Sequence, residues 1–79
     1  MYFVCVLKSD KDNKRYIGFT ENLERRIYEH YNGLVKSTKN RRPLKLIYFE
    51  EYDTKSEAMN REKFFKSGFG RSFLKKIEM

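Results

Sequence analysis

Residues 2–19 read YFVCVLKSDKDNKRYIGF, two apolar runs separated by a polar segment. The first run, residues 2–7, is apolar at both alternating sets of positions, which is typical of a strand covered on both faces. The polar segment contains Asp12-Asn13, which favours a turn, and residues 15–19 (Arg-Tyr-Ile-Gly-Phe) form a second, aromatic and β-branched run. The stretch therefore predicts a hairpin whose first strand lies at or near the centre of a sheet.

The segment after the hairpin predicts a helix and a basic loop. Asn22 can cap a helix that runs to about Asn32. Gly33 then stands where a left-handed residue commonly follows a helix end. Residues 35–42 are rich in Lys and Arg and are expected to form the loop.

The remaining residues predict one more strand and two helices. Residues 44–52 are strand-like, with aromatic and β-branched side chains at their centre. Thr54 and Glu57 form a capping-box pair that opens a helix ending near Ser67-Gly68, and a last short helix is expected over residues 71–77. This order predicts a single α/β (α+β) domain over residues 1–79, with a three-stranded, mostly antiparallel sheet flanked by helices.

Length and charge limit the possible functions. A chain of 79 residues makes one domain with no room for a large enclosed cavity, so an active site is expected on an open face. Lys and Arg total 18 against 11 acidic residues, which gives a net charge of +7. This charge suits a polyanionic partner such as nucleic acid, although a solvated basic surface without a partner is the alternative.

The compartment is indicated by cysteine usage and by the N-terminal residues. Cys5 is the single cysteine, which excludes an internal disulfide, and no Cys/His cluster has zinc-ligand spacing. The N-terminal apolar run is too short to span a membrane and lacks the basic leader of a signal peptide. We therefore expect a cytoplasmic protein with no membrane partner.

Helical periodicity singles out two residues of the first helix. At about 100° per residue, its apolar side chains share one arc that is expected to face the sheet. These side chains are Leu23, Ile27, Tyr31 and Leu34. Arg26 and His30 fall beside that arc on one edge, whereas Arg25 points to solvent. Arg26 and His30 are either a basic edge with a functional role or ordinary packing residues. In the second case Arg26 lies along the core with its charge in water, and His30 is a partly buried histidine.

The second helix carries an acid on its inner stripe, because Glu62 shares one arc with Ala58, Met59 and Phe65. Burying an unpaired carboxylate costs several kcal/mol, so Glu62 needs a cation. That cation is either a bound metal ion or a protein guanidinium, from Arg26 or Arg61, in a structural salt bridge.

Alternation along the second strand separates Tyr16 and Gly18 from Ile17. If Ile17 faces the core, the phenol of Tyr16 lies on the other surface, where it meets solvent, meets a ligand or simply packs. Gly18 permits a close approach of the backbone to a ligand, or marks a bulge.

These residues resemble the GIY-YIG nuclease superfamily, and the resemblance covers nearly the whole chain. Tyr16-Ile17-Gly18 matches the second signature tripeptide, Arg26 follows at the superfamily's spacing, and His30 stands one helical turn later. Arg61-Glu62 resembles the segment that carries the metal-binding Glu. The resemblance is closest to the small stand-alone bacterial members of the UPF0213 type.

The first signature tripeptide falls at Phe3-Val4-Cys5, and here the chain departs from the pattern. Phe3 replaces a Gly and Cys5 replaces a Tyr whose phenol helps to form the site in the superfamily. A downstream Asn of larger members has no evident counterpart after Asn60.

The resemblance implies a metal-dependent endonuclease that hydrolyses nucleic-acid phosphodiester bonds, with DNA favoured over RNA and little sequence specificity. Its catalytic residues would be Tyr16, Arg26, His30 and Glu62. Glu62 would hold one Mg²⁺ or Mn²⁺ ion, Arg26 would bind phosphate oxygens, and Tyr16 or His30 would act on the attacking water.

Several basic side chains could contact the nucleic-acid backbone without reading its sequence. They are Lys36, Lys39, Arg41, Arg42, Lys63 and Lys66. Two alternatives remain open: a nucleic-acid-binding module that does not cleave, and a protein-interaction adaptor that retains the fold.

Overall fold

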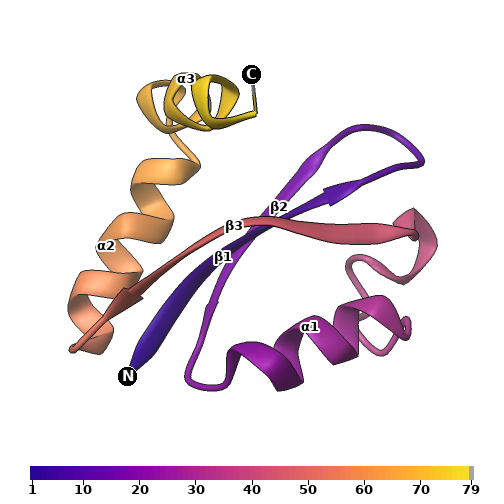
Figure 1. The fold of residues 1–79 in the computed structure, drawn as a ribbon, viewed down its shortest axis with the longest axis horizontal. Helices are drawn as coiled ribbons and strands as arrows, with labels where there is room; N and C mark the ends of the chain where they lie inside the picture. The colour runs from indigo at the N-terminus through magenta and orange to yellow at the C-terminus, as the bar shows by residue number, and fades with distance from the viewer. Residues whose placement is uncertain (79) are drawn as a thin grey trace.

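The computed structural model describes residues 1–78 and contains three strands in one antiparallel sheet (Figure 1). Strand β1 (Tyr2–Ser9) is central, between β2 (Arg15–Thr20) and β3 (Leu44–Tyr52). The central place of β1 confirms the prediction, since a strand covered on both faces is apolar at every position. Fold class and hairpin are as expected.

Three α-helices and a 3-10 turn complete the fold. They are α1 (Leu23–Tyr31), η1 (Lys39–Arg41), α2 (Lys55–Phe65) and α3 (Gly68–Ile77). The predicted caps are present: the Asn22 side chain accepts a hydrogen bond from Arg25 N–H and the Thr54 side chain accepts one from Glu57 N–H. Gly33 has φ +72°, the left-handed conformation expected after α1.

Helix α3 begins earlier than the predicted residue 71. It starts at Gly68 because the Ser67 side chain caps it by accepting a hydrogen bond from Gly70 N–H. An added Cβ at Gly70 would lie 2.0 Å from the carbonyl oxygen of Phe64. Gly70 is therefore a close packing point between α2 and α3.

The two faces of the sheet pack against different helices. One face contributes Val4, Val6 and Ile17 to a core with Ala58 and Phe65 of α2 and with Leu74 of α3. The opposite face carries Phe3, Cys5, Tyr16 and Gly18, because Cys5 pairs with Gly18 and Leu7 pairs with Tyr16 across the hairpin. Helix α1 covers this second face, where Tyr16 contacts His30. We call it the Tyr16 face.

The rotation of α1 differs from the predicted one. Leu34 is 66% exposed and Tyr31 is 45% exposed, although both were expected to face the sheet. His30 is buried instead. Gly33 ends the helix, so Leu34 leaves the helical phase, and the Tyr31 hydroxyl reaches β3 by accepting a hydrogen bond from Leu46 N–H. None of the helices in residues 1–78 has the length and apolar character needed to cross a membrane.

Candidate active site

The ring of Tyr16 lies over Gly18. An added Cβ at Gly18 would stand 3.2 Å from Tyr16 Cε1 and 3.6 Å from the phenolic oxygen. Glycine therefore leaves the space that the ring occupies. Since Cys5 pairs with Gly18 on the same face, the phenol of Tyr16 ends beside Cys5.

His30 is buried and contacts the Tyr16 ring, with 4.7 Å between the ring centroids. Its Nδ1 is 2.8 Å from Thr38 Oγ1, and its Nε2 is buried without a hydrogen-bond partner among the described residues. Burial lowers the pKa of His30, and the nearby charge of Arg26 lowers it further. His30 is therefore neutral near pH 7, with one ring nitrogen uncommitted.

Two opposite charges act on the buried thiol of Cys5. Burial raises the pKa of Cys5; the charge of Arg26 lowers it and the charge of Glu62 raises it. Arg26 comes from α1 and Glu62 from α2. The two helices thus bring a guanidinium and a carboxylate within electrostatic range of the same point, beside Gly18 and the Tyr16 phenol.

Arg26 and Arg25 differ as predicted. The Arg26 side chain is 35% exposed, whereas that of Arg25 is 75% exposed. Both lie near Glu29, at 3.5 Å from Arg26 and 3.6 Å from Arg25. Ion pairs this long at the surface contribute little to stability. The Arg26 guanidinium therefore keeps most of its hydrogen-bonding capacity.

Glu62 faces inward, with 20% of its side chain exposed, and neither predicted salt bridge forms. Arg61 pairs with Glu50 at 2.8 Å, and its guanidinium stacks over the rings of Phe64 and Phe65. Within residues 1–78, Glu62 pairs with Lys66, whose amine is 3.8 Å away. The Lys66 side chain is largely exposed to solvent. The carboxylate is thus left without a close protein cation.

The donor set around Glu62 restricts the metal that the site can hold. Residues 1–78 contain no group of three or more His, Cys, Asp or Glu side chains arranged around one ion. A divalent ion would take one carboxylate from Glu62, with water and a substrate phosphate at the remaining positions. Mg²⁺ commonly binds in this way, whereas Zn²⁺ and Ca²⁺ need more protein ligands.

The six predicted backbone-contacting cations do not form one surface. Arg41 pairs with Asp12 at 3.2 Å, and Arg42 donates a hydrogen bond to the carbonyl of Lys39. Lys36 and Lys39 are exposed on the loop after α1. Lys63 is exposed on α2, and Lys66, the residue that follows the end of α2, is exposed beside Glu62.

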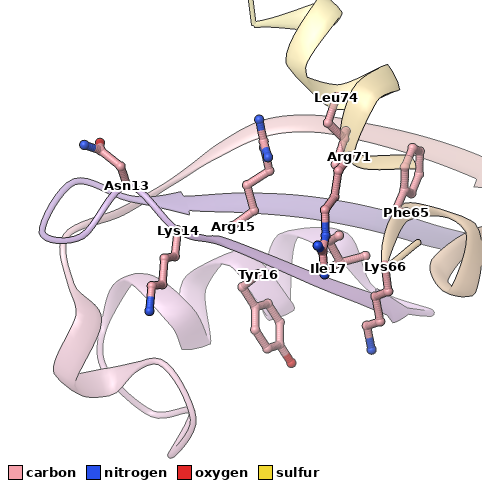
Figure 2. A pocket seen from close by; sticks show the side chains of 9 residues that line it. All are labelled: Asn13, Lys14, Arg15, Tyr16, Ile17, Phe65, Lys66, Arg71 and Leu74. Atoms are coloured by element: carbon pink, nitrogen blue, oxygen red, sulfur yellow. The ribbon is translucent and has the colours of Figure 1, made fainter. Parts of the chain in front are cut away.

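A hollow of about 740 Å³ adjoins Tyr16 and contains cations that sequence reasoning missed (Figure 2). Lys14, Arg15 and Arg71 line it together with Lys66. They come from the start of β2, from α3 and from the end of α2, so no local pattern connects them. Their basic character was the available signal, and it does not reveal which cations meet in space.

The chain matches known proteins over nearly its full length. The family model described as the GIY-YIG catalytic domain matches residues 1–77. A UPF0213 protein of Clostridium perfringens is 48% identical over 67 residues, which are 84% of this chain and 71% of that protein. A UPF0213 protein of Staphylococcus haemolyticus is 45% identical over 78 residues, covering 98% and 94% of the two chains.

A solved structure shares the fold. The solution NMR structure of a UPF0213 protein from Bacillus halodurans has a TM-score of 0.60 and 31% identity to this chain. The match covers 98% of this chain and 85% of that one.

Proposed function

The chain belongs to the GIY-YIG catalytic-domain family, and from this premise we propose that it is a metal-dependent endonuclease that hydrolyses nucleic-acid phosphodiester bonds. We further propose DNA as the substrate, one Mg²⁺ or Mn²⁺ ion as the cofactor, and little sequence specificity. The observation that carries the proposal is that the charges of Arg26 on α1 and Glu62 on α2 both act on Cys5, which pairs with Gly18 beneath the Tyr16 ring.

Arg26 binds the non-bridging oxygens of the phosphate in this proposal. Its guanidinium is partly exposed, and its contact with Glu29 is long enough to be replaced by a phosphate. The fixed fork of guanidinium donors suits two phosphate oxygens at once and stabilises the charge that grows on them in the transition state.

In this proposal Tyr16 binds the attacking water, and His30 packs against Tyr16 and accepts a proton. The phenol lies over Gly18 and contacts the ring of His30, and these contacts limit its freedom and would orient a bound water. His30 is buried, which favours proton acceptance over direct contact with phosphate. Being neutral, it has a lone pair for this role.

Glu62 holds the metal ion, since its inward-facing carboxylate lacks a close protein cation. A bound Mg²⁺ would stabilise charge on the phosphate and make a bound water more acidic. Low sequence specificity is proposed because the exposed cations are Lys and Arg side chains suited to phosphates, dispersed over several elements.

A second candidate function is nucleic-acid binding without cleavage, and Cys5 is the observation that favours it. Cys5 is buried on the Tyr16 face, at the position where the superfamily pattern has a Tyr. The chain therefore lacks a second phenol hydroxyl on this face. A thiol is a weak hydrogen-bond donor, so the water would be held mainly by Tyr16. A slow nuclease and a pure binding module both fit this substitution.

The substitution Glu62→Gln separates the two functions. It keeps the size and hydrogen-bonding ability of the side chain while removing the charge that attracts the metal. We expect Mg²⁺-dependent cleavage of labelled DNA to be abolished and binding to be retained, with Glu51→Gln, an exposed acid on β3, as the matched control. Undiminished cleavage by Glu62→Gln would overturn the metal assignment. Binding by the unsubstituted protein without any cleavage in Mg²⁺ or Mn²⁺ would favour the binding module.

A further inference from the structure

The hollow in Figure 2 has no role in the chemistry proposed above. It lies between β2 and the corner where α2 meets α3, and four cations line it with no acid among the lining residues. We propose that this hollow binds a backbone phosphate of the nucleic-acid strand, next to the phosphate held by Arg26 and Glu62. The inference rests on the proposed function, because it assigns a second subsite to the same substrate.

Two of the four cations have no partner within the described residues. Arg15 pairs with Glu78 and Lys66 lies loosely against Glu62, whereas the side chains of Lys14 and Arg71 make no ion pair or hydrogen bond with residues 1–78. Figure 2 shows Arg71 extending from α3 toward β2, where its tip lies over Ile17 in this view. Lys14 and Arg71, two like charges with no counter-ion among residues 1–78, raise the local concentration of anions.

The floor of the hollow suits a nucleotide better than a bare ion. The partly exposed side chains of Ile17 and Tyr16 line it, together with Phe65 and Leu74, which are fully buried. Apolar and aromatic surfaces accept the sugar and the base, while the cations at the rim accept the phosphate. The combination of an apolar floor and a basic rim therefore indicates a nucleotide unit of a strand.

The position of the hollow gives the path of that strand. Residues 13–17 line it, whereas residues 19–22 line a second hollow of about 460 Å³ that includes Arg26. Gly18 lies between the two. A strand that runs along the open edge of β2 would place one phosphate near Arg71 and Lys14, cross over Tyr16 and Gly18, and place another phosphate near Arg26.

The test measures binding without cleavage. Fluorescence anisotropy of a short labelled DNA is recorded in EDTA, over salt concentrations from about 50 to 200 mM. Arg71→Gln and Lys14→Gln should each bind roughly tenfold more weakly at low salt and lower the salt slope by about one. Lys76→Gln is the matched control, because Lys76 is exposed on α3 and does not line the hollow. Thermal unfolding confirms that each variant folds.

The outcomes separate this subsite from the proposed nuclease activity. If both variants bind like Lys76→Gln, the subsite is overturned, whether or not the protein cleaves. If Arg71→Gln and Lys14→Gln bind weakly but the unsubstituted protein does not cleave DNA in Mg²⁺, the subsite is supported and the nuclease proposal fails. Because Lys14 and Arg71 belong to different elements, a folding defect in one variant leaves the other to decide the question.

Discussion

Replacing Gly18 by Ala tests whether the placement of the Tyr16 phenol sets the rate of cleavage. The added methyl group would stand 3.2 Å from Tyr16 Cε1, closer than the roughly 3.5 to 4.0 Å of an unstrained carbon contact. The ring must move by a few tenths of an ångström. The buried ring of His30, in contact with Tyr16, blocks movement in its own direction.

Folding stability and activity should respond differently to this change. Overpacking costs about 1 to 3 kcal/mol in a closed core, but Tyr16 is only half-buried and can give way. Replacing Gly by Ala within a strand also stabilises by about 0.5 to 1 kcal/mol. The free energy of unfolding should therefore change by less than about 1 kcal/mol. A misplacement of about 1 Å can slow a reaction roughly a hundredfold, so a shift of a few tenths of an ångström at the phenol should slow it by roughly tenfold.

The assay is single-turnover cleavage of labelled DNA in Mg²⁺, measured beside thermal unfolding of the same preparation. Gly68→Ala is the control, because an added Cβ at Gly68 meets no atom within 4 Å. We expect at least a tenfold loss of rate for Gly18→Ala, in the range that misplaced groups produce, and none for Gly68→Ala. In a Tyr16→Phe background, which already lacks the hydroxyl, Gly18→Ala should have little further effect.

Two results would refute this reasoning. A stable Gly18→Ala protein that cleaves at the unsubstituted rate would show that the position of the phenol does not limit the reaction. An equal loss in the Tyr16→Phe background would show that Gly18 acts through something other than the Tyr16 hydroxyl, such as direct approach of the substrate to the backbone.

Three further predictions follow from the site and the fold. Arg26→Ala should lose at least tenfold more cleavage rate than Arg25→Ala, because the second side chain points to solvent, and equal losses in the same assay would contradict the assignment. Burial lowers the pKa of His30, so the unfolded chain binds a proton more readily, and the unfolding free energy should fall as the pH drops from about 6.5 to 5. Thermal unfolding of His30→Asn should lack this slope, and an unchanged slope would exclude His30 as its source. Gly70→Ala should destabilise by about 3 kcal/mol or more, since its Cβ would overlap Phe64 backbone, and a near-normal denaturant midpoint would show that α2 and α3 can separate.

Much of the fold could be read from local patterns in the sequence. Residues 2–7 are apolar at every position, and this placed β1 at the centre of the sheet. Asn22 and Thr54 marked the helix starts, because a capping side chain acts within one turn of its own residue. The inward position of Glu62 followed from helical periodicity, which is a property of a single element. The Tyr16-Ile17-Gly18 resemblance indicated the family before any contact was known.

What the sequence could not determine is how the elements meet. His30 was placed at an edge but is buried, because the rotation of α1 is decided by its packing on the Tyr16 face and by the chain reversal at Gly33. Arg61 was a possible partner for Glu62 but binds Glu50, a residue of β3 that only the folded sheet brings near.

The same holds for the hollow beside Tyr16. Lys14 lies about 50 positions before Lys66 and Arg71 in the chain, and these cations meet because α2 and α3 fold back over the edge of β2. Periodicity and capping act over a few residues, so the sequence by itself determined which elements form and the inward position of Glu62, but it did not determine the rotation of α1. Contacts between distant residues depend on how those elements pack, and the tertiary structure alone decided which charges stand together at the site.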